Sequence, residues 1–549
     1  MRSGWLVVCM AAAVAAWPGA AQEDGPPSDF VAYPDAPSVT YHTVEIAGEP
    51  VHYQATAGTL TLATDKIDAE SRARVFFVAY RRTLLSPAEV EQRLDDLREP
   101  VAESAASNDA SDAEPNDAAI PHDELFPDPT GRALTFSFNG GPGSSSVWLH
   151  LGVFGPKRVG YIDDEGNPGP PPYTVVPNAH SLVGESDFVF IDPVSTGFSR
   201  PDGETSEKEF HGLEQDLDSV AGFIKRYITR HGRWASPLFV AGESYGTTRA
   251  SALAERLHNA HGISVNGVIL VSTVIDFATI RFNPGHDLPF VCFLPTYAAT
   301  AHHHGMLSDE LQAMTPDELY AEARSFALGD YATALMQGTA LGEMSEAAVV
   351  KRMSELTGLS EQFIRRSNLR VNQRRFSKEL LRDRGLTAGR FDSRFTGQDI
   401  DDAGEGYEFD ASYAAIRANF TESFNSYIRG ELGFESDLSY EILTNVWPWD
   451  YGRAGEGRFV NVADRLRRVM HQQPHIRVFN AAGYHDLATP PLGADYAFDH
   501  MMLRPELREN IVRKYYYGGH MMYLLEPELE RLSRDLVEFY RQTPVGSTD

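Results

Sequence analysis

The sequence has little cysteine, with only Cys9 and Cys292 among its 549 residues. Cys9 lies in an N-terminal stretch that is expected to be removed, so Cys292 would remain alone. The mature chain can then form no internal disulfide. Cys292 sits in the apolar run 290–294, where a buried and inert thiol is expected. Stability must therefore come from packing, and a composition with 42% hydrophobic residues can supply a large core.

Positive charge is also scarce, because 48 basic side chains face 77 acidic ones and give a net charge of -29. Such an excess repels phosphate backbones and anionic lipid surfaces, so nucleic acid is not an expected partner. The sequence also has no phosphate-binding loop, no dinucleotide fingerprint and no internal repeat of solenoid spacing. We therefore predict no cofactor.

Long apolar runs are missing after the N-terminus. Residues 5–17 are apolar, follow Arg2 and precede the small residues 19–21, which is the pattern of a secretory signal peptide. The run is shorter than the roughly 20 residues of a membrane span. Cys9 lies too early in it for a lipoprotein signal. We predict a signal peptide over 1–21, a mature start at Gln22, and a secreted or periplasmic protein without stable membrane insertion.

Short apolar runs alternate with helical patterns through much of the chain. Residues 39–62 predict a hairpin, and further strands are predicted at 75–80, 133–138, 188–191, 238–241, 265–272, 476–481 and 511–517. Helices are predicted near 213–228 and from Pro527 onward. Strands that are apolar on both faces and alternate with helices indicate an α/β fold, with a mostly parallel sheet covered on both sides.

Two segments interrupt this alternation of predicted strands and helices. Residues 103–131 are acidic and poor in apolar side chains, which predicts a mobile surface insert. Residues 282–447 are richer in helical signals and charge, which predicts an inserted helical cap between core segments 22–281 and 448–549. The cap contains three consecutive histidines, 302–304. We expect them on its polar surface, because consecutive residues do not easily converge on one metal ion.

Residues 242–246 form a G-x-S-x-G sequence between the strand at 238–241 and a helical stretch at 247–258. The order strand, sharp turn, helix is the context of the nucleophile elbow in α/β-hydrolases, where glycines avoid a collision of side chains. The pattern predicts Ser244 as an exposed nucleophile.

A serine hydroxyl needs a base to take its proton and a carboxylate to orient that base. In α/β-hydrolases these partners follow the serine in the order acid, histidine, each in a loop after a late strand. Asp486 follows the strand at 476–481 and His520 follows the strand at 511–517. Alone, either residue would be assigned to a surface turn. Their order and placement predict a triad with Ser244.

Acyl transfer also needs donors for the oxyanion. One is expected from the backbone N–H of Tyr245, the residue after the nucleophile. The second is expected from the glycine-rich loop 139–143, which follows an early strand and lets the backbone approach a substrate closely. An ordinary glycine turn is the alternative interpretation of this loop.

Four motifs together resemble the serine carboxypeptidase family: 139–146 (NGGPGSSS), 192–199 (DPVSTGFS), 242–246 (GESYG) and 519–521 (GHM). The resemblance implies an α/β-hydrolase with a helical cap that removes the C-terminal residue of a peptide, typically at acid pH. In that family an Asn and two acids hold the free carboxylate, and one acid must carry a proton. The resemblance assigns the following roles: triad Ser244, Asp486 and His520; oxyanion donors Gly141 and Tyr245; substrate-binding residues Asn139, Gly140, Glu243 and Met521.

The chain departs from the family pattern at three places. Val153 stands where the second acid is usual, Ser144 replaces a cysteine of the glycine loop, and the turn bearing Asp486 lacks an extra acidic residue. Glu243 has a structural alternative, as a prop for the elbow. We predict a carboxypeptidase acting on peptides with a free C-terminus. The alternatives are an esterase or acyltransferase with the same triad, and a non-catalytic binding protein. The sequence leaves the oligomeric state open.

Overall fold

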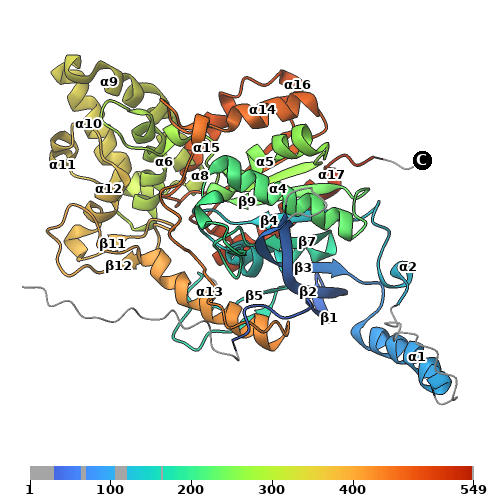
Figure 1. Cartoon of the computed structure of the whole chain (residues 1–549). Coiled ribbons are helices and arrows are strands. Elements are labelled where there is room, and N and C mark those ends of the chain that lie inside the picture. The colour runs from blue at the N-terminus through green and yellow to red at the C-terminus, as the bar shows by residue number, and fades with distance from the viewer. Residues whose placement is uncertain (1–29, 64–69, 106–119, 162, 164, 547–549) are drawn as a thin grey trace, which may run out of the picture.

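The computed structural model describes residues 30–63, 70–105, 120–161, 163 and 165–546 (Figure 1). The predicted signal peptide, with Cys9, lies outside the described residues. The described chain contains a ten-stranded sheet with the order β1-β2-β3-β7-β4-β9-β10-β13-β14, and β8 pairs with β3. Its strands are β1 (Ser38–Ile46), β2 (Glu49–Ala63), β3 (Ser71–Arg82), β4 (Ala133–Phe138), β7 (Ser186–Ile191), β8 (Arg200–Pro201), β9 (Leu238–Glu243), β10 (Gly267–Val271), β13 (Arg477–Gly483) and β14 (Ile511–Tyr516).

The sheet has an antiparallel beginning and a parallel remainder. β1, β2, β3 and β7 pair antiparallel, and the pairs from β7 through β4, β9, β10 and β13 to β14 are all parallel. The predicted α/β-hydrolase fold is therefore confirmed. Parallel strands have their carboxyl ends at one edge of the sheet, so the loops after β4, β9, β13 and β14 open toward the same edge.

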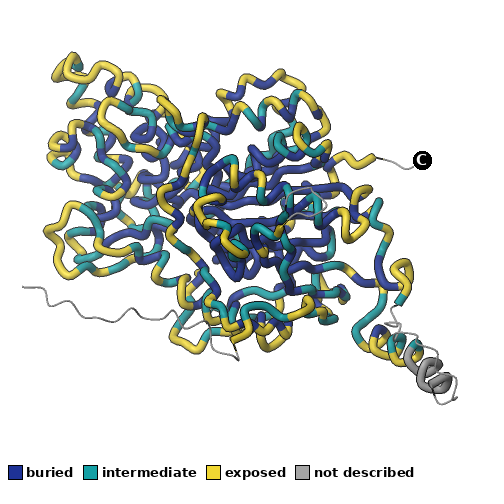
Figure 2. The backbone as a smooth tube through the Cα atoms, viewed as in Figure 1, coloured by how far each residue is buried: buried dark blue, intermediate teal, exposed yellow. Residues whose placement is uncertain are grey.

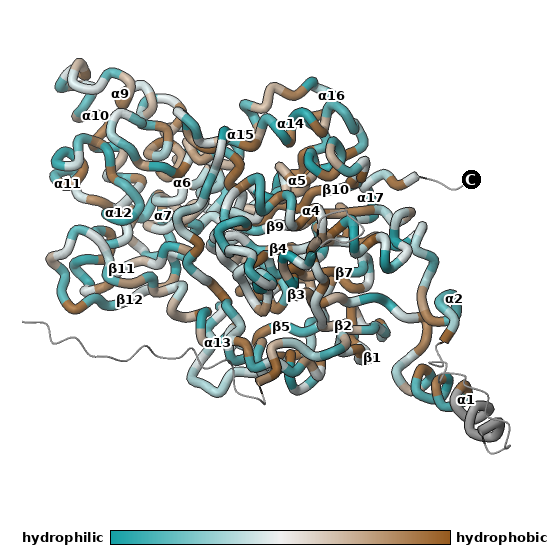
Figure 3. The backbone as a smooth tube through the Cα atoms, viewed as in Figure 1, coloured by the Kyte–Doolittle hydropathy of each residue, from teal (hydrophilic) through white to brown (hydrophobic). Residues whose placement is uncertain are grey.

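Helices cover both faces of the sheet, and successive strand residues pack into different layers, as the two-residue period of a strand requires. On β9, Val240 belongs to one buried cluster and Phe239 to the other. The first cluster includes apolar residues of α4 (Leu213–Arg230), α5 (Tyr245–His261) and α14 (Ala463–Gln472). The second includes those of α17 (Glu526–Gln542) and α13 (Ala411–Gly430). Figures 2 and 3 show the buried, hydrophobic strands between these layers.

The helices of the predicted cap do not share one packing environment. A third buried cluster is formed mainly by cap helices, which lie together to one side of the sheet in Figure 1. They are α6 (Leu288–His303), α7 (Asp309–Gln312), α8 (Pro316–Phe326), α9 (Ala332–Gln337), α10 (Glu343–Thr357), α11 (Glu361–Arg366) and α12 (Gln373–Glu379). In contrast, Ile416, Phe420 and Phe424 of α13 pack with the core. The end of the cap at residue 447 remains a prediction.

The predicted insert at 103–131 is only partly described, because 106–119 lie outside the described residues. Before it, α1 (Pro87–Ala105) extends away from the body of the molecule (Figure 1). After it, α2 (His122–Leu125) ends at Leu125, and Leu125 and the next residue, Phe126, are buried against Val90. The second half of the segment is therefore packed, because it contains the apolar pair that the acidic first half lacks.

The remaining described elements are short. They are α3 (Val147–Leu149), α15 (Pro491–Asp499), α16 (Pro505–Arg508), and the strand pairs β5 (Lys157–Val159) with β6 (Val175–Pro177) and β11 (Thr387–Ala388) with β12 (Thr396–Gly397). Within the described ranges, no helix combines the length and the hydropathy that crossing a membrane requires.

Candidate active site

Ser244 occupies the tight turn between β9 and α5. Its backbone has φ 59° and ψ −127°, a conformation that is strained for a residue with a side chain and is held by the surrounding structure. A Cβ on Gly242 would lie 2.1 Å from the Gly246 carbonyl oxygen, so only glycine fits there. The turn is therefore as sharp as the G-x-S-x-G pattern predicts, and Ser244 is the residue at its tip.

Asp486 and His520 meet at the same edge of the sheet, in the loops that follow β13 and β14. Their side chains are buried, and His520 Nδ1 lies 2.8 Å from Asp486 Oδ2. The Asp486 carboxylate also accepts the N–H groups of Ala488 and Thr489 at 2.7 and 2.9 Å and the Thr489 hydroxyl at 2.7 Å. These donors fix the carboxylate, which in turn fixes the orientation of the imidazole.

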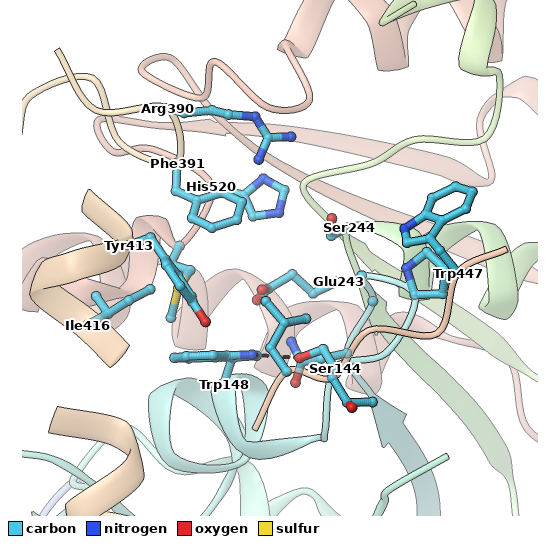
Figure 4. Close-up of a pocket in the computed structure, with 17 residues that line it drawn as sticks. Ser144, Trp148, Glu243, Ser244, Arg390, Phe391, Tyr413, Ile416, Trp447 and His520 are labelled. Atoms are coloured by element: carbon cyan, nitrogen blue, oxygen red, sulfur yellow. Dashed lines mark hydrogen bonds between the residues drawn. The ribbon is translucent and has the colours of Figure 1, made fainter. Parts of the chain in front are cut away.

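His520 is held so that its other nitrogen is free for the cavity. Because Nδ1 faces Asp486, Nε2 lies on the opposite side of the ring, and Figure 4 shows the ring and the Ser244 hydroxyl at the same cavity. Burial disfavours the charged imidazolium, but the carboxylates of Asp486 and Glu243 outweigh it and raise the pKa of His520. The ring is thus a stronger base than an ordinary histidine.

The glycine loop after β4 packs directly on the elbow. A Cβ on Gly140 would lie 2.4 Å from the Tyr245 nitrogen, and Gly141 has φ 104°, which favours glycine. The Tyr245 N–H is at the first position of α5, where no acceptor exists within the helix. The structure thus brings Gly141 and Tyr245, the two predicted oxyanion donors, next to Ser244.

The second motif, 192–199, supports this loop. Asp192 is fully buried after β7 and its Oδ1 accepts both the N–H and the hydroxyl of Ser146, at 2.8 and 2.7 Å. On the other side of the loop, the buried Arg249 donates to the Asn139 carbonyl at 2.6 Å and to Asp216 at 2.7 Å. Two buried side chains, Asp192 and Arg249, therefore fix the glycine loop from two directions, which keeps its backbone amides in place.

These residues surround a cavity of about 320 Å³ (Figure 4). Predicted site residues in its lining are Asn139, Gly140, Gly141, Glu243, Ser244, His520 and Met521. Tyr245 and Asp486 lie behind it, and both are buried. The remainder of the lining is largely aromatic and apolar, with Trp148, Phe391, Tyr413, Ile416, Leu443 and Trp447. The cavity thus combines a reactive centre with apolar walls, as small-molecule and peptide sites do.

Two polar groups in this cavity lack the usual compensation for burial. Asn139 is 1% exposed, and its Oδ1 accepts the Leu149 N–H at 3.1 Å. Its Nδ2 makes no hydrogen bond of good geometry with the described residues, but the Asn139 side chain is close enough to the Glu243 carboxyl to favour the charged form of that group. Glu243 is also buried, and desolvation raises its pKa to about 7, although His520 and the Tyr523 hydroxyl favour its charged form. A buried amide donor without a hydrogen bond of good geometry and a carboxyl that is readily protonated are both suited to hold an anionic group.

Tyr523 is a member of the site that the sequence analysis missed. Its buried hydroxyl donates to Glu243 Oε2 at 2.5 Å, and its ring packs on Gly152, where a Cβ would lie 2.4 Å from the ring. Gly152 precedes Val153, the position at which the second acid was expected. The available signal was a tyrosine in an otherwise apolar run after His520, because a buried tyrosine hydroxyl requires a partner.

Val153 itself does not reach the cavity. It lies in a π-helical turn, His150–Phe154, and is fully buried in the core cluster that contains α13 and α17. Val153 therefore supplies no second acid to the cavity, and the Glu243 carboxyl instead accepts the Tyr523 hydroxyl.

Residues 390–394 of the predicted cap were also missed, although they join the two late loops. The Arg390 carbonyl accepts the Leu487 N–H at 3.1 Å, and the Phe391 carbonyl accepts the His520 N–H at 2.5 Å. Asp392 Oδ2 accepts the Gly519 N–H at 3.1 Å and pairs with Arg394. This segment thus fixes the backbone next to both Asp486 and His520. No local periodicity marks such a role in the sequence.

Ser144, which replaces the cysteine of the family pattern, has a hydrogen-bonding role. Its hydroxyl accepts the Trp148 indole N–H at 2.7 Å, and the backbone around it bridges to Leu443 (Figure 4). Ser144 therefore orients one aromatic wall and links the glycine loop to the end of the cap without a disulfide.

The three histidines at 302–304 are half-buried where the cap meets the core, which corrects the expectation of a polar surface. The rings of His303 and His304 bond to the Tyr517 hydroxyl at 2.9 Å and the Ser393 carbonyl at 2.7 Å. In the described part of the chain, no group of three or more candidate side chains is arranged to hold a metal ion.

The family model and the curated relatives that match this chain are all described as carboxypeptidases. A family model described as serine carboxypeptidase matches residues 124–380, which include Asn139 and Ser244 but end before Asp486 and His520. A serine carboxypeptidase-like 45 of Arabidopsis thaliana is 26% identical over 200 residues, covering 35% of this chain and 38% of that protein. A pheromone-processing carboxypeptidase KEX1 of Yarrowia lipolytica is 29% identical over 135 residues, covering 24% and 20%. The matches thus span well under two thirds of these relatives.

Solved structures to which the chain is similar include a proline iminopeptidase of Mycobacterium smegmatis and a putative aryl esterase of Burkholderia cenocepacia. Both are 15% identical, with a TM-score of 0.31 and coverage of 76% of this chain; the match covers 91% and 92% of those chains. A likeness at this level says nothing about the substrate of this chain.

Proposed function

The chain belongs to the serine carboxypeptidase family of α/β-hydrolases, and from this premise we propose that it is an exported enzyme that releases C-terminal residues from peptides. The observation that carries the proposal is the position of Glu243 and Asn139 beside Ser244. A buried acid with a pKa of about 7 lines the cavity that is proposed to contain the nucleophile, and beside it lies an amide whose Nδ2 has no hydrogen bond of good geometry.

In the proposed reaction, Ser244 Oγ attacks the carbonyl carbon of the last peptide bond. His520 Nε2 takes the hydroxyl proton and then gives it to the leaving amine, so the C-terminal amino acid departs and an acyl-enzyme remains. Water, deprotonated by His520, attacks the acyl-enzyme, and the shortened peptide is released with the proton returned to Ser244. Asp486 stabilises the imidazolium that forms in each half.

The Gly141 and Tyr245 amides hold the oxygen that becomes negative in each tetrahedral intermediate. Both belong to backbone segments that pack rigidly against the elbow, so their dipoles need no reorganisation during the reaction. Gly140 contributes by allowing this close packing, because any side chain there would overlap the Tyr245 nitrogen.

The free carboxylate of the substrate is held by Asn139 and Glu243. The Asn139 Nδ2 group donates to it, and Glu243 donates when protonated. Tyr523 bonds to one Glu243 oxygen and so fixes the direction of the other. Met521 forms part of the apolar wall beside this clamp. An unprotonated Glu243 would repel the substrate, which gives the enzyme its preference for acid conditions.

An esterase or acyltransferase activity on the same triad is the second candidate, because Val153 removes one acid from the clamp. The two candidates are separated by three matched substrates: a peptide with a free C-terminal acid, its C-terminal amide and a simple ester of the same acyl group. We expect the free acid to give the highest kcat/KM below about pH 7, where Glu243 is protonated. A ranking with the ester first and no difference between acid and amide would favour the second candidate.

The direct test is mass spectrometry of a mixed peptide pool after incubation with the purified protein. Successive loss of residues from the C-terminus is expected, and trimming from the other end or no trimming would contradict the proposal. Labelling of Ser244 by a fluorophosphonate separates an enzyme from a non-catalytic binding protein. Export is tested by sequencing the N-terminus of protein recovered outside the cytoplasm, which is expected to begin near Gln22.

A further inference from the structure

Arg390 lines the cavity, but no residue of the described chain pairs with its guanidinium. The side chain is half-buried, with its Cζ 5.1 Å from the centre of the Phe391 ring, and its positive charge acts on His520 and Tyr407. Among the described residues it makes no ion pair and no side-chain hydrogen bond.

The backbone of Arg390 is fixed on both sides. Its N–H donates to Asp410 Oδ1 at 2.9 Å, and its carbonyl accepts the Leu487 N–H from the loop that bears Asp486. The Asp410 carboxylate also accepts the N–H and the hydroxyl of Ser412, at 3.1 and 2.5 Å. The Asp410 carboxylate thus accepts neutral donors and anchors the backbone, and Asp392, the acid nearest to Arg390 in the chain, pairs with Arg394 instead.

The guanidinium lies on the opposite side of the reactive centre from the carboxylate clamp. In Figure 4, Ser244 and His520 lie between Arg390 on one side and Glu243 on the other. If the terminal residue of the substrate extends from Ser244 toward Glu243 and Asn139, the remaining peptide must leave the cavity on the side of Arg390. This step depends on the proposed function, because it takes the clamp as the site of the free carboxylate.

We infer that Arg390 forms a subsite for an acidic side chain on the acyl side of the scissile bond, so that the enzyme prefers substrates with Glu or Asp before the residue it releases. A guanidinium presents several N–H donors in a planar fork that matches a carboxylate in two parallel hydrogen bonds. The cavity supplies an apolar surround, in which such a pair is stronger than on an open surface.

The test compares peptides that differ only by Glu or Gln at the penultimate position, since these side chains have the same shape and differ in charge. We expect the Glu peptide to have about a tenfold higher kcat/KM at low ionic strength. The preference should weaken as salt is added, because the site is partly exposed. Arg390→Met should bring the ratio close to one, and Arg390→Lys should retain part of it.

Arg417→Met is the matched control, since it removes the same charge from an exposed position on α13 and should leave the Glu-to-Gln ratio unchanged. Each variant is first titrated with a fluorophosphonate, so that rates refer to folded, reactive enzyme. The Glu-to-Gln ratio of kcat/KM at a fixed pH also cancels any effect of Arg390 on His520, because both peptides react through the same His520.

The inference would be overturned by a Glu-to-Gln ratio of kcat/KM near one in the unaltered protein. A preference for Glu that survives in Arg390→Met would also overturn it. A preference for Glu at the last position instead of the penultimate one would also contradict it, because the subsite would then face the leaving residue. The comparison is repeated with esters of acyl-glutamate and acyl-glutamine. If no peptide is shortened, the proposed function fails, and the esters still decide whether Arg390 selects an acidic acyl group.

Discussion

Replacing Glu243 with Gln separates the role of this residue in substrate binding from the chemistry of the triad. The pKa of Glu243 is about 7, so the fraction that is protonated falls from about nine tenths at about pH 6 to about one tenth at about pH 8. Only the protonated form donates to the carboxylate of a substrate. Binding of a free-acid peptide should therefore weaken about tenfold over this range. Gln is neutral at every pH and should abolish the dependence.

The assay is the ratio of kcat/KM for a peptide acid to kcat/KM for its C-terminal amide, measured across the same range. Both substrates require a neutral His520, whose pKa is raised by Asp486 and Glu243 against the effect of burial, so the rising limb of activity cancels in the ratio. The ratio should fall about tenfold between about pH 6 and about pH 8 for the unaltered protein and stay flat for Glu243→Gln. A flat ratio in the unaltered protein, or the same fall in the variant, would refute the role given to Glu243.

Three further changes test other parts of the site. Ser244→Ala should lower turnover by several powers of ten in a peptide-release assay while the melting temperature stays near that of the unaltered protein; near-normal release would exclude Ser244 as nucleophile. Tyr523→Phe removes a hydrogen-bond donor that favours the charged form of Glu243, so the pKa of Glu243 should rise. The fall of the acid-to-amide ratio should then move to higher pH, and a move to lower pH would contradict the contact. Asp216→Ala leaves Arg249 buried without its acidic partner. The free energy of unfolding, measured by denaturant titration, should fall by about 3–5 kcal/mol. A fall below about 1 kcal/mol would show that the pair is not buried in solution.

Local sequence determined the parts of this protein that depend on neighbours in the chain. The glycines at 242 and 246 allow the sharp turn around Ser244. Consecutive residues such as Phe239 and Val240 point to opposite faces of the strand and so join different layers. The order of strands and helices then predicted the α/β-hydrolase fold, and parallel pairing places the loops of Asp486 and His520 at the same edge. In these cases the local sequence is sufficient, because the turn and the orientation of strand residues depend only on neighbours in the chain.

Only the tertiary structure decided which distant residues complete the site. Tyr523 meets Glu243 across 280 positions of the chain, and Arg390 enters the cavity because residues 390–394 bridge the two late loops. The same holds for α13, whose apolar face packs with the core although it lies within the predicted cap, residues 282–447. Hydrogen bonds and contacts between remote segments leave no period in the sequence, because they depend on how whole layers pack and not on the spacing of residues along one element.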